Sequence, residues 1–174
     1  ITFTNIIATE TAVRRNILDG IRAINQGVQD EVGKQFGADG KELTVHANSA
    51  PDNEPIQGHQ FSNTEFDKLQ AGQPFVDYEG RKFKPIARPI GVWNCRHFTY
   101  SIILGVTKPN YTTQQLDKMI EDNQKGYTDP KGKHYTMYEC TQKQRDYESK
   151  IRKNKELQRT LKDSGDIEGA KKVQ

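Results

Sequence analysis

Three of the four histidines and one of the two cysteines fall in two short segments of the chain, at His46, His59, Cys95 and His97. Imidazole and thiolate groups are the preferred ligands of zinc, and four of them complete a tetrahedral structural site. Cys95 and His97 are two positions apart, so in a strand their side chains point to the same side. One hypothesis is therefore a zinc site. The alternative is that the same side chains are packed or hydrogen-bonded without a metal.

A second hypothesis for these polar residues is a metal-free catalytic cleft. In such a cleft a histidine acts as general acid or base, and an arginine holds a phosphate group. The candidate residues are His46, Asp52, His59, Arg96 and His97. The structural alternative is that Asp52 and Asn53 form a turn while Arg96 pairs with an acidic neighbour. The sequence has no phosphate-binding P-loop, nucleophile elbow or His-Glu-x-x-His motif, so nucleotide hydrolysis, ordinary ester hydrolysis and zincin chemistry lack their usual residues.

The composition limits the classes of protein to which the chain can belong. A length of 174 residues suits one ordinary domain with a helical extension. With 33% hydrophobic and 28% charged residues we expect a modest core and helices that are partly solvated or packed on partners. Two cysteines do not make a disulfide framework, which favours a reducing cytoplasm. No apolar run approaches the roughly 20 residues needed to cross a bilayer, so no membrane partner is expected.

The net charge of +3 is too small to indicate nucleic-acid binding by itself, but the charge is unevenly distributed. Residues 141–174 contain ten Lys or Arg and six Asp or Glu. This segment is helical in propensity and carries only a thin apolar stripe. It is a candidate contact for DNA phosphates or an acidic protein surface, and a solvated helix face is the alternative. The candidate binding residues are Arg145, Lys150, Arg152, Lys153, Lys155 and Arg159.

Hydrophobic periodicity predicts a long helix over residues 9–36. Apolar residues recur every three or four positions along one face, at Val13, Ile17, Ile21, Ile24, Val28, Val32 and Phe36. Thr9 or Thr11 is expected to cap its start and Gly37 to end it. Three internal glycines each cost up to about 1 kcal/mol, so packing against a neighbour must help to hold the helix. We expect assembly with a partner to bury Ile17, Ile21 and Ile24.

The remaining elements are predicted as short strands and helices, which makes the fold class α+β. We predict three parts: a long N-terminal helix over residues 1–38, a small mixed sheet domain with short helices over 39–139, and a C-terminal helical extension over 140–174. The loop over residues 48–61 is expected to converge with the segment around His97. The predicted elements are a strand over 43–46, a short helix after Ser62 or Asn63, a hairpin over 75–83, a strand over 98–106, a helix over 112–126, a strand over 133–139 and helices from Thr141 with a break at Ser164-Gly165.

Four stretches of sequence carry a resemblance to a known family. They are His46-Ala-Asn-Ser-Ala-Pro-Asp-Asn-Glu-Pro-Ile-Gln-Gly58, Phe61-Ser62, Arg88-Pro-Ile-Gly91 and Trp93-Asn-Cys-Arg-His97. Together with the charged helical segment that follows, they resemble phage minor capsid protein type 2. They are more distantly similar to the Mu F-like head morphogenesis family. The likeness covers roughly residues 40–163. This chain has Asn53 where the family often has a second histidine after the aspartate.

The resemblance implies a low-copy structural or accessory protein of a tailed-phage head. Such a protein would act in head assembly near the portal or on the packaged genome, with portal or capsid proteins and packaged DNA as expected partners. Its expected location is the virion head, and the host cytoplasm during assembly. Some relatives carry toxin-like or nuclease-like domains, so an enzyme using His46, His59 and His97 is the alternative. The sequence establishes no cofactor, and zinc is the one that the residues suggest.

Overall fold

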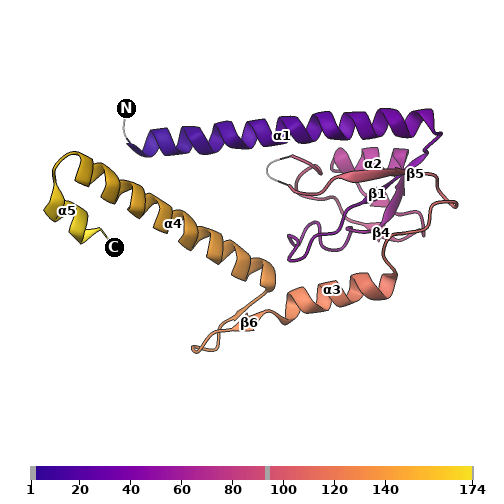
Figure 1. Ribbon diagram of the computed structural model, residues 1–174. Coiled ribbons are helices and arrows are strands. Elements are labelled where there is room, and N and C mark those ends of the chain that lie inside the picture. The colour runs from indigo at the N-terminus through magenta and orange to yellow at the C-terminus, as the bar shows by residue number, and fades with distance from the viewer. Residues whose placement is uncertain (1–2, 93–94, 174) are drawn as a thin grey trace. The chain divides into compact units, whose positions relative to one another are not determined.

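The computed structural model describes residues 3–92 and 95–173, which form a mixed helical and sheet protein (Figure 1). The predicted α+β class is confirmed: the structure has small antiparallel sheets, a long N-terminal helix and C-terminal helices. The chain divides into two compact units, residues 1–120 and 121–174. No helix among the described residues is long and apolar enough to cross a membrane.

The first unit begins with helix α1, Phe3–Gln35. It starts before Thr9 and Thr11, so neither threonine is the cap that the sequence predicted. Gly37 ends the helix as predicted, because its φ of 74° lies in the left-handed region that glycine adopts without strain. At Gly33 the helix touches the sheet so closely that an added Cβ would lie 2.4 Å from the Cβ of Ser101. Glycine is therefore required at this contact.

The main sheet has three antiparallel strands in the order β2-β1-β5, with β1 (Gly40–Leu43) between β2 (Gln60–Ser62) and β5 (Thr99–Ile102). The strand predicted over 43–46 is therefore wrong in position. The ladder stops because the backbone N–H of His46 donates to the side-chain oxygen of Gln57, at 3.0 Å, and not to a neighbouring strand. The strand predicted over 98–106 is confirmed only in its first part, as β5.

The core of the first unit lies where this sheet meets helix α2 (Asn63–Gln70) and the hairpin of β3 (Phe75–Val76) and β4 (Lys82–Phe83). Both the helix and the hairpin were predicted. Ser62 caps α2 by accepting a hydrogen bond from the N–H of Glu65, at 3.2 Å. The hydrophobic core cluster comprises Leu43, Ile56, Phe61, Phe66, Leu69, Phe75, Ile86, Ile90 and Cys95.

Helix α3 (Thr113–Lys125) leads into the second unit, where β6 (Tyr127–Thr128) and β7 (His134–Tyr135) form a two-stranded sheet. Helix α4 (Met137–Asp163) follows, and a turn at Ser164-Gly165 precedes α5 (Ile167–Lys172), as predicted. The strand predicted over 133–139 is too long. Thr136 and Glu139 form a capping box, each side chain bonding the backbone N–H of the other, so the chain turns helical from Met137.

Candidate functional site

The segment at residues 95–99 and the loop before β2 converge, as the sequence predicted. Burial alternates along this segment: Cys95, His97 and Thr99 are buried, whereas Arg96 and Phe98 are exposed. The alternation follows from extended backbone, in which successive side chains point to opposite faces. Cys95 and His97 therefore share the inner face, below the loop. Trp93 and Asn94, which belong to the same motif, lie outside the described residues.

His97 is held between two side-chain amides of the loop. The Nδ2 amide of Asn53 lies 3.4 Å from Nδ1 of His97, and Oε1 of Gln57 lies 3.4 Å from Nε2. An amide N–H at Nδ1 and a carbonyl oxygen at Nε2 fit a neutral imidazole that carries its proton on Nε2. Burial, the nearby His46 and the charge of Arg88 lower the pKa of His97 to about 4. The buried imidazole is therefore neutral at physiological pH.

The four residues predicted as zinc ligands are not brought to one point. His46 packs edge-on against His97 with ring centroids 4.6 Å apart, and Cys95 Sγ lies 3.5 Å from His97 Nδ1. His59 instead donates from Nδ1 to Asp77, at 2.8 Å. The described residues contain no group of three or more His, Cys, Asp or Glu placed to hold a metal ion. The structure thus does not confirm the zinc site, and amides occupy the places beside His97 that a metal would need.

The residues predicted for a catalytic cleft are likewise divided. Arg96 is exposed, on the face opposite His97, and it is its carbonyl oxygen that accepts a hydrogen bond from His46 Nε2, at 2.9 Å. Asp52 pairs with Arg88, whose Nε lies 3.4 Å from the Asp52 Oδ2. Arg88, and not Arg96, is thus the cation whose charge is felt at His97. The sequence could not separate the two arginines, because both lie close to the histidine motif.

The depressed pKa of His97 predicts a pH dependence of stability. Between pH 6.5 and about 4 the unfolded chain binds a proton at His97 that the folded chain does not. The free energy of unfolding should therefore fall as pH is lowered through this window, by about 3 kcal/mol from this residue, and level off outside it. Denaturant unfolding at several pH values measures the slope. The His97→Gln variant should lose that part of the slope, and an unchanged slope in the variant would contradict the assignment.

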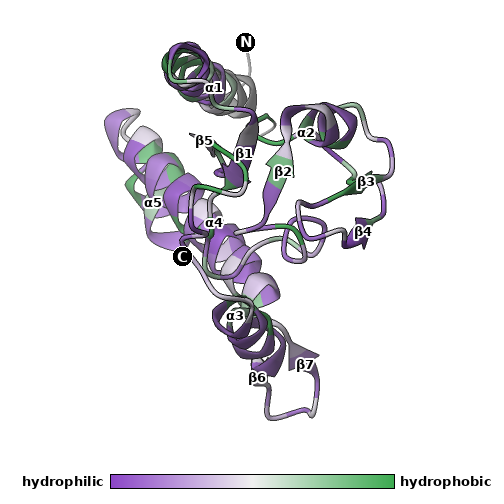
Figure 2. Ribbon diagram, turned by 90° about the vertical axis from the view of Figure 1, so that its right-hand side faces the viewer, coloured by the Kyte–Doolittle hydropathy of each residue, from purple (hydrophilic) through white to green (hydrophobic). Residues whose placement is uncertain are grey.

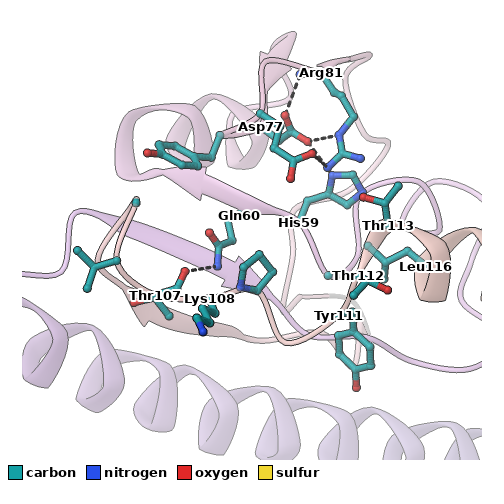
Figure 3. A pocket seen from close by; sticks show the side chains of 16 residues that line it. His59, Gln60, Asp77, Arg81, Thr107, Lys108, Tyr111, Thr112, Thr113 and Leu116 are labelled. Atoms are coloured by element: carbon teal, nitrogen blue, oxygen red, sulfur yellow. Dashed lines mark hydrogen bonds and ion pairs between the residues drawn. The ribbon is translucent and has the colours of Figure 1, made fainter.

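His59 belongs to a different site, a cavity of about 540 Å³ beside the β3–β4 hairpin (Figure 3). Asp77, from the hairpin, accepts hydrogen bonds from His59 Nδ1 at 2.8 Å and from Arg81 Nε at 2.6 Å. Burial alone would raise the pKa of Asp77, but the bonds from His59 and Arg81 outweigh it, and the pKa is lowered. The ionised carboxylate thus links the hairpin to His59, the residue that precedes β2. The sequence analysis missed Asp77 and Arg81, whose only signal was their place on either side of the Glu79-Gly80 turn.

The basic residues predicted for DNA or partner binding lie on α4, of which no residue is buried. Helical spacing puts Arg145, Arg152, Lys155 and Arg159 on one face, and Lys150 and Lys153 on the other. Acidic residues interrupt both faces: Lys150 Nζ lies 2.6 Å from Asp146, and Glu148 and Glu156 line a shallow groove with Arg152 and Lys155. The helix is thus an exposed surface of mixed charge with a basic excess.

Helix α1 of the first unit has a face that packs on the sheet and a face that does not. The helix contacts the sheet through polar side chains. Arg22 donates to the carbonyl oxygen of Cys95 at 2.9 Å, and Gln26 Oε1 accepts from the N–H of Thr99 at 3.0 Å. β5 is an edge strand of the sheet, so Gln26 occupies a backbone group of Thr99 that would otherwise be open to another strand.

The opposite face of α1 carries the apolar residues that the sequence predicted, and it is exposed to solvent. Ile24 is 69% exposed and Ile17 57% exposed. Figure 2 shows that this helix carries both hydrophobic and hydrophilic residues. We call this surface the α1 stripe. Its residues are Val13, Ile17, Ile21, Ile24, Val28 and Val32. An ordinary surface helix turns such a stripe toward its own core, so the stripe is a candidate contact surface.

Comparison with protein families shows that the family model described as phage minor capsid protein 2 matches residues 7–174. The match thus includes nearly all of α1, the sheet unit and the C-terminal helices. No curated protein and no solved structure matches the chain.

Proposed function

The chain belongs to the phage minor capsid protein 2 family and is thus a structural protein of the phage head, and we propose that it acts in head assembly by docking its α1 stripe on other virion components. Family membership implies a location in the virion head. The finer role includes contact with the portal or the capsid shell, and a cytoplasmic stage in the host before the particle is complete.

One observation carries this proposal: α1 turns its polar face to the sheet and its apolar face to solvent. Burying an aliphatic side chain contributes about 1.5–3 kcal/mol when it is fully withdrawn from water. Six half-exposed side chains along one helix therefore leave a large gain that a docked partner would supply. In this proposal residues 1–38 are the assembly element, residues 39–120 support it within the same unit, and residues 140–174 are a basic accessory arm.

The location is tested by separating heads from tails and by measuring the protein in each by quantitative mass spectrometry. We expect it in heads, both empty and filled, at a copy number well below that of the major shell protein. Its presence in filled heads alone would point to the genome as its anchor. Recovery only with tails would contradict the proposal.

A second function, contact with packaged DNA, is favoured by the exposed basic face of α4. Among the described residues, no carboxylate lies within salt-bridge distance of Arg152 or Lys155, so both are available to phosphates. The variant with Arg152→Gln and Lys155→Gln should bind duplex DNA more weakly. Its slope of log affinity against log salt should be shallower by about two, one for each lost phosphate contact.

Lys150→Gln serves as the control for this DNA prediction. The Lys150 amine is already paired with Asp146, so its loss should change the slope much less. Fluorescence anisotropy at four salt concentrations supplies the measurement. Affinity that is low and independent of salt in the parent chain would exclude a phosphate contact by α4.

The alternative, a nuclease-like enzyme using His46, His59 and His97, has less support. His59 lies in the hairpin cavity and is committed to Asp77, whereas His46 and His97 lie under the loop. Both ring nitrogens of His97 face loop amides, which leaves neither directed at a substrate. General acid–base chemistry needs a titrating group within reach of the substrate proton.

A further inference from the structure

The α1 stripe has a symmetric spacing. Its six residues are separated by four, four, three, four and four positions, so the order of intervals is the same read in either direction. Each position of the first half has an apolar counterpart eleven positions later: Val13 is followed by Ile24, Ile17 by Val28, and Ile21 by Val32. An eleven-residue repeat corresponds to 3.67 residues per turn, so the stripe drifts by only about 20° around the helix between its two halves. The stripe therefore runs straight along α1 for about 30 Å.

Two glycines border the stripe and leave room for close approach. Gly20 and Gly27 lie one helical turn either side of Ile24, and no atom lies within 4 Å of a Cβ built on them. Each costs the isolated helix about 1 kcal/mol relative to alanine. Neither has a positive φ, and among the residues that the structure describes neither has a neighbour that would require glycine. A second backbone packed against the stripe is the neighbour that such positions suit.

We propose that the stripe is covered by the same stripe of a second copy of this chain, with the two α1 helices antiparallel. The inference rests on the proposed function, since it names a second copy of this chain as the virion component that covers the α1 stripe. In this register Val13 of one copy lies level with Val32 of the other, Ile17 with Val28, and Ile21 with Ile24. A two-fold axis produces this arrangement, because residue i meets j and j meets i.

Charge selects the antiparallel direction. Arg14 flanks the N-terminal end of the stripe and Glu31 its C-terminal end. In the antiparallel register Arg14 of one copy lies level with Glu31 of the other, and the two helix dipoles oppose. A parallel pair would instead stack Arg14 on Arg14 and Glu31 on Glu31. Both directions place apolar side chains opposite apolar side chains, so the flanking charges decide between the antiparallel and the parallel pair.

The sheet of each copy does not obstruct the pair. Arg22, Gln26 and Asp30 hold α1 to its own unit from the side opposite the stripe. The second helix therefore approaches a face that carries no other element of the first unit. The exposed apolar surface of the stripe is several hundred Å² per copy, so the pair would bury on the order of 1,000 Å² or more, which a specific interface requires.

The pair is tested by mixing two single-cysteine chains under mild oxidation. Ile17→Cys and Val28→Cys are each made with Cys140→Ser, and the two chains carry tags of different size. Cys95 is buried and stays in both. The antiparallel register predicts that the mixed disulfide exceeds either homodisulfide by at least tenfold. Light scattering of the parent chain should give a dimer at micromolar concentration.

Three results would overturn the proposal. Homodisulfides in excess would show a parallel pair, and equal yields would show random collision. A monomer at 100 µM with no cross-link would exclude self-pairing. The failure of this inference is distinguishable from that of the proposed function. If the chain is a monomer but its stripe variants are excluded from heads, self-pairing is wrong and head docking still holds. If the chain forms the cross-linked dimer but its stripe variants enter heads normally, self-pairing holds and the docking role is wrong.

Discussion

Replacing Ile21 and Ile24 by glutamine is expected to remove most copies of this protein from assembled heads without unfolding it. Glutamine keeps the helix propensity but deletes two half-exposed aliphatic side chains from the α1 stripe. The lost burial amounts to about 2–4 kcal/mol of association free energy, a factor of roughly thirty to a thousand in affinity. Quantitative mass spectrometry of purified heads measures the copy number.

The control for this experiment lies on the same helix. Asn25→Ser with Gln29→Ser also alters two exposed positions but spares the stripe, and it should leave the copy number unchanged. The thermal midpoint of each variant, measured at low concentration, should stay within a few degrees of the parent. Normal incorporation of the glutamine variant would show that the stripe is not the docking surface.

The Asp77→Ala variant is expected to lower the free energy of unfolding by about 2–4 kcal/mol. Asp77 is 5% exposed and accepts bonds from His59, from the Arg81 side chain and from the Arg81 backbone N–H. Its removal leaves the buried His59 without its partner, and an unpaired buried polar group costs far more than the net worth of one bond. Urea unfolding at neutral pH measures the change.

Glu79→Ala supplies a matched comparison, because Glu79 pairs with the same Arg81, at 2.8 Å, but is exposed. A surface ion pair contributes 0–1 kcal/mol, so this variant should change the unfolding free energy little. Comparing the two losses of unfolding free energy shows whether the stability comes from the buried Asp77 or from pairing of the Arg81 side chain. Equal losses in the two variants would contradict the structural role assigned to Asp77.

Local periodicity was sufficient to predict α1, and it identified the stripe residue by residue. It could not predict which face meets the sheet. An apolar stripe normally faces the core, but here an edge strand offers open backbone groups at Thr99. Gln26 fills them from the polar face, bonding both the N–H and the carbonyl oxygen of Thr99. Such a preference depends on the whole sheet and has no signal in the helix sequence.

The histidine cluster was half predictable for a similar reason. The alternation that places Cys95 and His97 on one face is local, and the sequence identified it. The partner of His59 is Asp77, eighteen positions away on a hairpin, and only the pairing of β3 with β4 brings the two together. Around His97 the neighbouring groups are the side-chain amides of Asn53 and Gln57, and their positions depend on how the loop folds over the histidine.

The central claim, that the α1 stripe is covered inside the head, is tested most directly by thiol labelling of intact particles. Heads are assembled with Ile24→Cys or, as a control, with Gln73→Cys, which lies in an exposed turn of the sheet unit. Both chains carry Cys140→Ser, and N-ethylmaleimide is added before or after the heads are dissolved. We expect Cys at position 73 to react in both states and Cys at position 24 to react only after dissolution. Equal labelling at position 24 in intact and dissolved heads would contradict the claim.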